Sequence, residues 1–391
     1  MENNFKVREK NKQKFYQKKG FKVFVIILVF VFLGGGIFAW KTGGVINKIS
    51  KGGIFQTIVK NIPGVDNKLK GETDNRINIL LLGMRGENIP GGGLLADTII
   101  VASINPKENK ASMISIPRDL YVSNPGWGNK SKINAVYAAG EENGKKQGLE
   151  DMKKVVGEAV GLPIHYSASI NFAGFKQIID AIGGIEITLD KPFQEAVQFN
   201  EAHVCDPHVF TIPTGKFQIK VNKRGETTEY PLCTNPQTEC GGNFSLPAGT
   251  QVLNGEKALC YVRSRATSSD FERAKRQQVV IQLVKDKMLS IGTLADFSKG
   301  NALLNALGDN IRTDMEIWEM QRFYEIYKNM SDTQIYQRVL ENSAEGLLYN
   351  PTNMPKEVGY ILLPIGDNYN QIHEMAKNIF TLPAQSDIKP K

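Results

Sequence analysis

Residues 77–117 contain three short apolar runs, which read INILLL at 77–82, DTIIVAS at 97–103 and ASMISIP at 111–117. Each run is rich in isoleucine, leucine, valine or methionine and has the length of a strand, so each predicts a β-strand. Helix patterns follow further along the chain, and these strands are therefore expected to form a sheet with helices packed against it.

Helix and strand patterns alternate in the residues that follow. The helix patterns cover residues 149–160, 172–182, 315–330 and 332–340, and the strand patterns cover residues 164–170, 185–189 and 360–363. Such alternation predicts an α/β fold, a three-layer α-β-α sandwich with a mixed central sheet.

The amino terminus combines a basic tail with an apolar segment. Residues 1–22 carry eight lysines and arginines against two glutamates, which gives +6 of the chain's net charge of +8. Residues 23–40 contain no charge and would span roughly 27 Å as a helix, enough to cross a bilayer. Positive charge before this segment predicts a cytoplasmic tail and one uncleaved transmembrane helix, with the rest of the chain outside the cell membrane. A cleaved signal peptide is the alternative, but Phe38-Ala39-Trp40 lacks small residues at a cleavage site.

The remainder of the chain divides into a stalk at residues 41–75 and a large domain at residues 76–391. The stalk is rich in glycine and lysine, whereas the domain is close to neutral because most of the net charge lies in the tail. A nucleic-acid-binding function, which the overall basic charge alone suggests, is therefore disfavoured.

A cluster of arginines at residues 259–277 predicts a binding site for a polyanion. Residues 259–265 read as a strand, which would place Arg263 and Arg265 on the same face, and a helix is expected to follow from Ser269. On that helix Asp270, Arg273 and Gln277 fall within about 60° of one another. Arginine binds phosphate oxygens in a bidentate manner, so the cluster suits a phosphate or pyrophosphate. Surface ion pairs between these arginines and neighbouring carboxylates are the alternative.

Two further groups of polar residues lie at predicted strand ends, where α/β sheets place their sites. Asp97 opens the second strand, and Arg118 and Asp119 follow the third. Asp97 and Asp119 are candidate ligands for magnesium, which takes one or two protein carboxylates together with water and phosphate oxygens. Capping of turns is the commoner role of aspartate and the alternative here.

The sequence motifs of this chain, and their order along it, resemble those of the LytR-CpsA-Psr family. The matching pieces are ILLLG at 79–83, Asp97-Thr98, SIPRD at 115–119, KIN at 132–134, Gly183-Gly184, LNGEKAL at 253–259, Arg263-x-Arg265, DxxRxxRQ at 270–277 and YILLP at 360–364. The resemblance implies a membrane-anchored phosphotransferase that moves a glycopolymer from a polyprenyl-pyrophosphate carrier onto peptidoglycan or another cell-wall acceptor, or onto protein. It also implies an apolar tunnel between sheet and helices for the prenyl chain, with the pyrophosphate at its mouth.

The resemblance also implies roles for individual residues. Arg118, Arg263, Arg265, Arg273 and Gln277 would bind the pyrophosphate, and Asp97 would hold Mg²⁺. Asp119 or Asp270 would accept the proton of the attacking hydroxyl, and the alternative role of Asp270 is to orient an arginine. The arginine pair Arg263 and Arg265 would stabilise the transferring phosphate.

The chain departs from the family pattern at two positions. Met84-Arg85-Gly86 stands where an acidic residue is usual, and Leu95-Ala96-Asp97 stands where Arg-Ser-Asp is usual. Arg85 is the candidate replacement for the missing arginine, and Glu87 for the missing carboxylate. These departures leave three activities open: glycopolymer transfer, hydrolysis of the carrier pyrophosphate without transfer, and binding of the lipid-linked glycopolymer without turnover.

The cysteines lie in and beside an insert at residues 191–243. Cys205, Cys233 and Cys240 lie within it and Cys260 follows it. Outside the membrane a disulfide between two of the insert cysteines is expected, and Cys260 is expected to be buried. A zinc site formed by His203, Cys205, His208 and Cys233 is the alternative, although it lacks paired C-x-x-C spacing.

Overall fold

A computed structural model of the chain describes residues 67–86, 93–195, 203–205, 212–221, 225–234, 244–264, 270–290, 307–330, 333–352 and 359–383. No helix within these ranges is both long and apolar enough to cross a membrane. The predicted transmembrane segment at residues 23–40, the basic tail and most of the stalk lie outside the described ranges.

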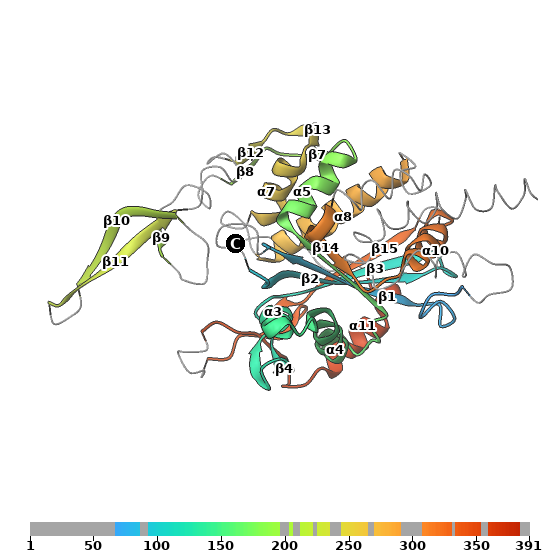
Figure 1. Cartoon of the computed structure of the whole chain (residues 1–391), viewed down its shortest axis with the longest axis horizontal. Helices are drawn as coiled ribbons and strands as arrows, with labels where there is room; N and C mark the ends of the chain where they lie inside the picture. The colour runs from blue at the N-terminus through green and yellow to red at the C-terminus, as the bar shows by residue number, and fades with distance from the viewer. Residues whose placement is uncertain are drawn as a thin grey trace, which may run out of the picture.

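A six-stranded sheet forms the centre of the domain, in the order β14-β6-β1-β2-β3-β15 (Figure 1). Its strands are β1 (Ile77–Met84), β2 (Ala96–Asn105), β3 (Lys110–Ile116), β6 (Tyr166–Asn171), β14 (Ile311–Thr313) and β15 (Gln334–Val339). The pairs β1–β2, β2–β3 and β6–β14 are antiparallel, whereas β1–β6 and β3–β15 are parallel. The predicted α/β fold with a mixed sheet is confirmed, and the three runs within residues 77–117 form neighbouring strands of that sheet.

The burial of β1 explains why this sheet has helices on both faces. Ile79 and Leu80 are adjacent and point to opposite faces, yet both are buried, at 7% and 0% exposure. Leu80 belongs to one apolar cluster and Ile79 to another. A nearly continuous apolar strand is typical of a sheet that is covered on both sides.

Two groups of helices provide this cover (Figure 1). Below the sheet in the figure lie α3 (Ala135–Glu141), α4 (Gly148–Val160) and α11 (Asn370–Lys377), and above it lie α5 (Phe172–Ala181), α7 (Gly255–Arg263) and α8 (Asp270–Ser290). A further helix, α10 (Ile317–Lys328), packs through Trp318 and Ile326 against Ile77 and Tyr166 of the sheet. The expected helix at 315–330 is therefore confirmed.

Shorter elements connect these layers. They are β4 (Tyr121–Asn124), β5 (Asn129–Lys132), β7 (Ile185–Leu189), β13 (Gly249–Leu253), β16 (Glu341–Asn342), β17 (Leu347–Tyr349), β18 (Leu363–Pro364) and the 3-10 helices Glu142–Gly144, Gly308–Asn310 and Ile379–Thr381.

The carboxy-terminal part differs from the sequence expectation at residues 332–340. The predicted helix is wrong, because residues 334–339 form strand β15, which pairs in parallel with β3. Short apolar runs fit helix and strand patterns equally well, and pairing with β3 decides between them. The last predicted strand contributes Leu362, which is 4% exposed and bridges to Leu120, and β18 begins at the next residue.

The cysteine-containing insert projects from the body as a β-hairpin (Figure 1). Its described strands are β8 (Phe193–Glu195), β9 (His203–Val204), β10 (Ile212–Val221) and β11 (Thr227–Thr234), and β12 (Phe244–Leu246) returns the chain to the body. A disulfide between Cys205 and Cys233 joins β9 to β11, with 4.9 Å between the two Cα atoms. The predicted insert disulfide is confirmed, and these two cysteines cannot be zinc ligands because their sulfurs are bonded to each other.

Cys260 on α7 is buried at 1% exposure, as predicted, but it is also disulfide-bonded. That second disulfide was not predicted. The remaining cysteine of the chain, Cys240, lies outside the described residues.

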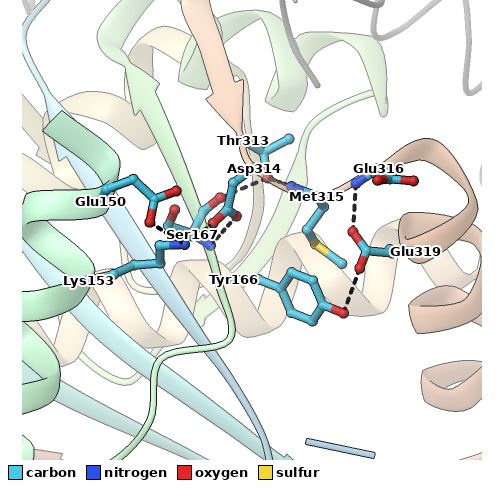
Figure 2. Close-up of polar contacts among 9 residues, drawn as sticks. All are labelled: Glu150, Lys153, Tyr166, Ser167, Thr313, Asp314, Met315, Glu316 and Glu319. Carbon is cyan, nitrogen blue, oxygen red and sulfur yellow. Dashed lines mark hydrogen bonds and ion pairs between the residues drawn. The ribbon is translucent and has the colours of Figure 1, made fainter. Parts of the chain in front are cut away.

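A buried polar network fixes the edge strand β14 to the sheet (Figure 2). Thr313 Oγ1 donates to the carbonyl oxygen of Ser167 at 2.7 Å, and Ser167 N donates to Asp314 Oδ1 at 2.7 Å. The other Asp314 oxygen forms an ion pair with Lys153 of α4, which also pairs with Glu150 at 3.0 Å. The network therefore ties α4, β6 and β14 together.

A second part of the same network holds the start of α10 (Figure 2). Tyr166 Oη donates to Glu319 Oε1 at 2.9 Å, and Glu319 Oε2 accepts a hydrogen bond from Glu316 N at 2.8 Å. Burial raises the pKa of Tyr166, and the hydroxyl therefore keeps its proton for this bond.

Candidate functional site

A cavity of about 780 Å³ lies between the sheet and the helices α5, α7 and α8. Its walls are mostly apolar. The sheet contributes Leu81, Ile100, Ala168 and Ile170, and the helices contribute Phe175, Ile178, Ile179, Leu259, Val262, Val280, Ile281 and Val284. The cavity occupies the space between sheet and helices in which the family resemblance places a prenyl chain.

Charged and amide side chains line the same cavity. Except for Asn171, they belong to residues predicted for the site from the sequence, namely Arg85, Asp97, Arg118, Arg263, Arg273 and Gln277. Arg85 follows β1, Asp97 lies at the start of β2, and Arg118 follows β3. Arg263 is the last residue of α7, and Arg273 and Gln277 lie in the first half of α8. The fold thus brings together residues that are far apart in the chain, and it places four arginines around one space. Like charges at such a site repel one another, which favours a bound anion.

Ion pairs fix the side chains of Arg118 and Asp119, which follow β3. Arg118 Nη1 lies 3.0 Å from Asp97 Oδ1, and Arg118 Nε lies 3.6 Å from Asp119 Oδ2. The second oxygen of Asp119 pairs with Lys132 Nζ at 2.8 Å. Asp97 lines the cavity, whereas Asp119 lies beside Arg118 and is not part of the cavity lining.

The segment that carries Arg263 is a helix, and the predicted strand at residues 259–265 is wrong. Helix α7 begins after Asn254, whose Oδ1 accepts a hydrogen bond from Lys257 N at 3.0 Å. Tyrosine and valine favour strands when considered alone. Here residues 258–262 are all buried, in one cluster with α5 and α8, and this packing together with the Asn254 cap stabilises a helix instead.

Arg263 is consequently the last residue of a helix rather than one of two neighbours on a strand face. Its guanidinium lies 4.6 Å from the centre of the Phe172 ring, which orients it by a cation–π contact. Arg265 lies outside the described residues. Asp270 is the first residue of α8, but its side chain is outside the described part of the structure, as is Glu87.

Arg273, Arg276 and Gln277 of α8 have two different roles. Arg273 and Gln277 line the cavity, whereas Arg276 is only 8% exposed. Arg276 Nε donates to the carbonyl oxygen of Tyr261 at 3.1 Å, and its guanidinium donates to the carbonyl oxygen of Ser264. Burial lowers the pKa of Arg276 from its usual value. Its donors satisfy carbonyls at the carboxy end of α7, so Arg276 positions the helix end that carries Arg263.

Sequence reasoning did not assign most of the apolar lining to the site, and it also missed Asn171 and Val204. Asn171 caps α5 by accepting a hydrogen bond from Gly174 N at 2.9 Å, and it donates to Asn310 Oδ1 at 2.8 Å. An asparagine directly before a helix pattern is a recognisable capping signal. Val204 belongs to the insert, and no local pattern connects it with the cavity.

The described residues contain no group of three or more His, Cys, Asp and Glu side chains that could hold a metal ion. Among carboxylates, Asp97 lines the cavity beside the arginines. One carboxylate is compatible with magnesium when phosphate oxygens and water complete its shell, so the residues present fit an ion that arrives with a phosphorylated substrate.

Comparisons with known proteins identify relatives of this chain in sequence and in fold. The chain is 28% identical over 236 residues to the polyisoprenyl-teichoic acid–peptidoglycan teichoic acid transferase TagU of Enterococcus faecalis. The aligned region covers 60% of this chain and 59% of the relative. It is 26% identical over 327 residues to the TagU protein of the same description from Bacillus cereus, with 79% of this chain and 84% of the relative covered.

The fold matches the solved structure of TagT bound to LIIa-WTA with a TM-score of 0.52 and 21% identity, covering 83% of this chain and 96% of that chain. The sequence also matches the LytR_cpsA_psr family over residues 50–358, which is most of its length. The chain therefore belongs to the LytR_cpsA_psr family.

Proposed function

We propose that this protein transfers a glycopolymer from a polyprenyl-pyrophosphate carrier to peptidoglycan. One observation carries the proposal: a single cavity combines apolar walls with a lining of Arg85, Arg118, Arg263 and Arg273. An apolar space of this size suits a hydrocarbon chain, and clustered guanidinium groups suit a pyrophosphate. The names of the TagU relatives, which specify teichoic acid transfer to peptidoglycan, support the same reaction class.

The reaction is a phosphoryl transfer in which positioning and charge neutralisation supply most of the rate. A hydroxyl oxygen of the acceptor attacks the phosphorus attached to the glycan, and the bond from this phosphorus to the prenyl phosphate oxygen breaks. The arginines stabilise the negative charge on the transferring group and on the leaving prenyl phosphate. The hydroxyl proton passes to a carboxylate, and Asp119 and Asp270 are the two candidates.

Asp97 is the residue that would hold Mg²⁺, and Arg118 at 3.0 Å would orient its carboxylate. A bound magnesium ion would add positive charge against the pyrophosphate oxygens.

The proposal also includes a location. The segment at residues 23–40 would anchor the protein with its amino terminus in the cytoplasm, and residues 76–391 would lie outside. The Cys205–Cys233 disulfide supports this placement, because structural disulfides persist mainly in oxidising compartments.

The test is a transfer assay with purified protein and a prenyl-pyrophosphate-linked glycan, with and without peptidoglycan fragments, in magnesium or in a chelator. We expect release of prenyl phosphate that depends on the acceptor. Arg263→Ala and Arg118→Ala should each lower kcat/KM by about 100-fold or more, because each removes a donor to the charged transition state. Arg322→Ala is the matched control, since Arg322 pairs with Glu72 outside the cavity.

The competing activities give different results in the same assay. Release of prenyl phosphate in the absence of the acceptor would indicate a pyrophosphatase. Tight binding of the carrier without release of prenyl phosphate would indicate a binding protein. Normal turnover of Arg263→Ala would contradict the assignment of the site. Between Asp119→Asn and Asp270→Asn, the variant that binds the carrier without turning it over identifies the proton acceptor.

A further inference from the structure

The hairpin of β4 and β5 extends from the candidate site to an exposed tryptophan. It leaves the site at Lys132, whose Nζ pairs with Asp119 Oδ1 at 2.8 Å, and turns at residues 125–128. Strands of four residues span about 13 Å, so the turn lies within reach of a short oligomer that starts at Asp119.

Trp127 in this turn is 45% exposed and yet held in place. Its Nε1 donates to Glu142 Oε1 at 3.0 Å. The backbone around it is also fixed: a Cβ on Gly126 would lie 2.8 Å from Ala139, and Gly128 has a φ of +70° and donates to the carbonyl oxygen of Asn124 at 2.8 Å. The indole is therefore an exposed apolar ring held in a fixed position, so the binding of a ligand to it costs little side-chain conformational entropy.

One face of the hairpin leads from the tryptophan to the site. Val122 and Asn124 are buried, so Tyr121 and Ser123 point to the opposite, exposed side. Their cross-strand partners are Lys132 and Lys130. The exposed side therefore carries hydroxyls and ammonium groups between the Asp119 pair and the indole.

We propose that this face binds the glycan strand of the acceptor. A flat aromatic ring beside hydrogen-bonding groups matches a sugar, which has an apolar ring face and a polar periphery. Lysines also match the carboxylates that peptidoglycan carries on its peptides. The proposal rests on the proposed function, since the bound strand must present a hydroxyl near Arg118 and Asp119. A lipid surface fits less well because the face has only one large apolar side chain beyond Tyr121.

The experiment measures transfer while acceptor and carrier concentrations are varied separately. Trp127→Ala should raise the acceptor KM about tenfold, which corresponds to the loss of one aromatic contact, and should leave the carrier KM unchanged. Trp127→Phe should restore part of the acceptor affinity. Phe217→Ala is the control, because Phe217 is 57% exposed on the insert hairpin away from this face.

A direct titration makes the test independent of catalysis. Full-length protein is titrated with a β-1,4-linked N-acetylglucosamine tetrasaccharide by calorimetry, and binding should weaken about tenfold in Trp127→Ala at unchanged thermal stability. Equal binding by wild type and variant, or no binding by either, would overturn the subsite. A fall in melting temperature with a parallel rise in carrier KM would show a structural role and would also overturn it. If the titration gives the expected result but the wild type does not transfer the glycan, the proposed function would be contradicted instead.

Discussion

Two arginines three residues apart on α8 show how strongly the role of a residue depends on its surroundings. Arg273 lines the cavity, whereas Arg276 is buried against the end of α7. Helical spacing separates their directions by about 300°, or 60° in the shorter sense, and the packing of α7 decides which of the two contacts the cavity. The chemistry of a guanidinium is the same in both positions, but Arg276 donates to carbonyl oxygens at the end of α7, whereas Arg273 lines the cavity.

Single residues also set the pH dependence of stability. His165 accepts a hydrogen bond from Asn78 N at 3.0 Å through its Nδ1, which requires that nitrogen to be unprotonated. Burial lowers the pKa of His165 below its usual 6.5, and the charge of Lys70 acts in the same direction.

The unfolded chain therefore binds more protons than the folded chain at pH values between the lowered pKa and 6.5, and the free energy of unfolding rises with pH across that window. The stabilisation is complete above the unfolded pKa and is lost as pH falls through the folded one. We expect a lower urea midpoint at about pH 5.5 than at about pH 7.5. His165→Gln, whose Oε1 can accept the same hydrogen bond, should reduce this difference, and an unchanged difference would assign it to other groups.

At the scale of elements, the contacts of a segment override its local preference. The sequence patterns predict the wrong element for residues 259–263 and 334–339, a strand for the first segment and a helix for the second. The first is buried between α5 and α8 as a helix, and the second completes the sheet beside β3. Short apolar runs carry little periodic information, so neighbours far away in the chain determine their conformation.

The attachment of β14 and α4 to β6 can be measured through its buried ion pair. The side chains of Lys153 and Asp314 are 15% and 5% exposed, so Lys153→Met would leave a buried carboxylate without its charge partner. Burial alone would lower the pKa of Lys153, but its hydrogen bonds and the charges of Asp314 and Glu150 raise it overall. We expect a loss of about 3 kcal/mol in the free energy of unfolding, measured by urea denaturation.

Glu150→Gln is the matched control for this pair. Glu150 is 44% exposed, and removal of its charge should cost less than about 0.5 kcal/mol. A similar small effect of Lys153→Met would show that the buried pair contributes nothing to stability.

At the scale of the whole molecule, the insert and the body share one cavity. Val204 lies next to Cys205, and the disulfide to Cys233 holds β9 on β11. The apolar lining that residue 204 provides thus depends on a covalent link within a projecting hairpin.

Removal of that link should weaken binding of the prenyl carrier. In a Cys205→Ser/Cys233→Ser variant we expect an increase of about threefold in the carrier KM, equivalent to losing burial of roughly one methylene group. The acceptor KM should stay unchanged. An unaltered carrier KM in a correctly folded variant would show that the insert does not contribute to the lipid site. Mass spectrometry of the unreduced wild type should give a mass lower than that of the reduced protein by four hydrogen atoms, since the Cys205–Cys233 bond and the bond of Cys260 each remove two.

The amino-acid sequence by itself determined the α/β class, the three strands within residues 77–117, a disulfide within the insert, and the charged residues and Gln277 that line the cavity. These features follow from local signals: apolar runs of strand length, helical periodicity, cysteine placement and charged residues at strand ends. The tertiary structure alone decided that Arg263 ends a helix, that Arg276 is buried while Arg273 faces the cavity, and that Val204 of the insert joins the lining. Each of these depends on packing between segments that are distant in the chain, and such packing leaves no periodic trace in the sequence.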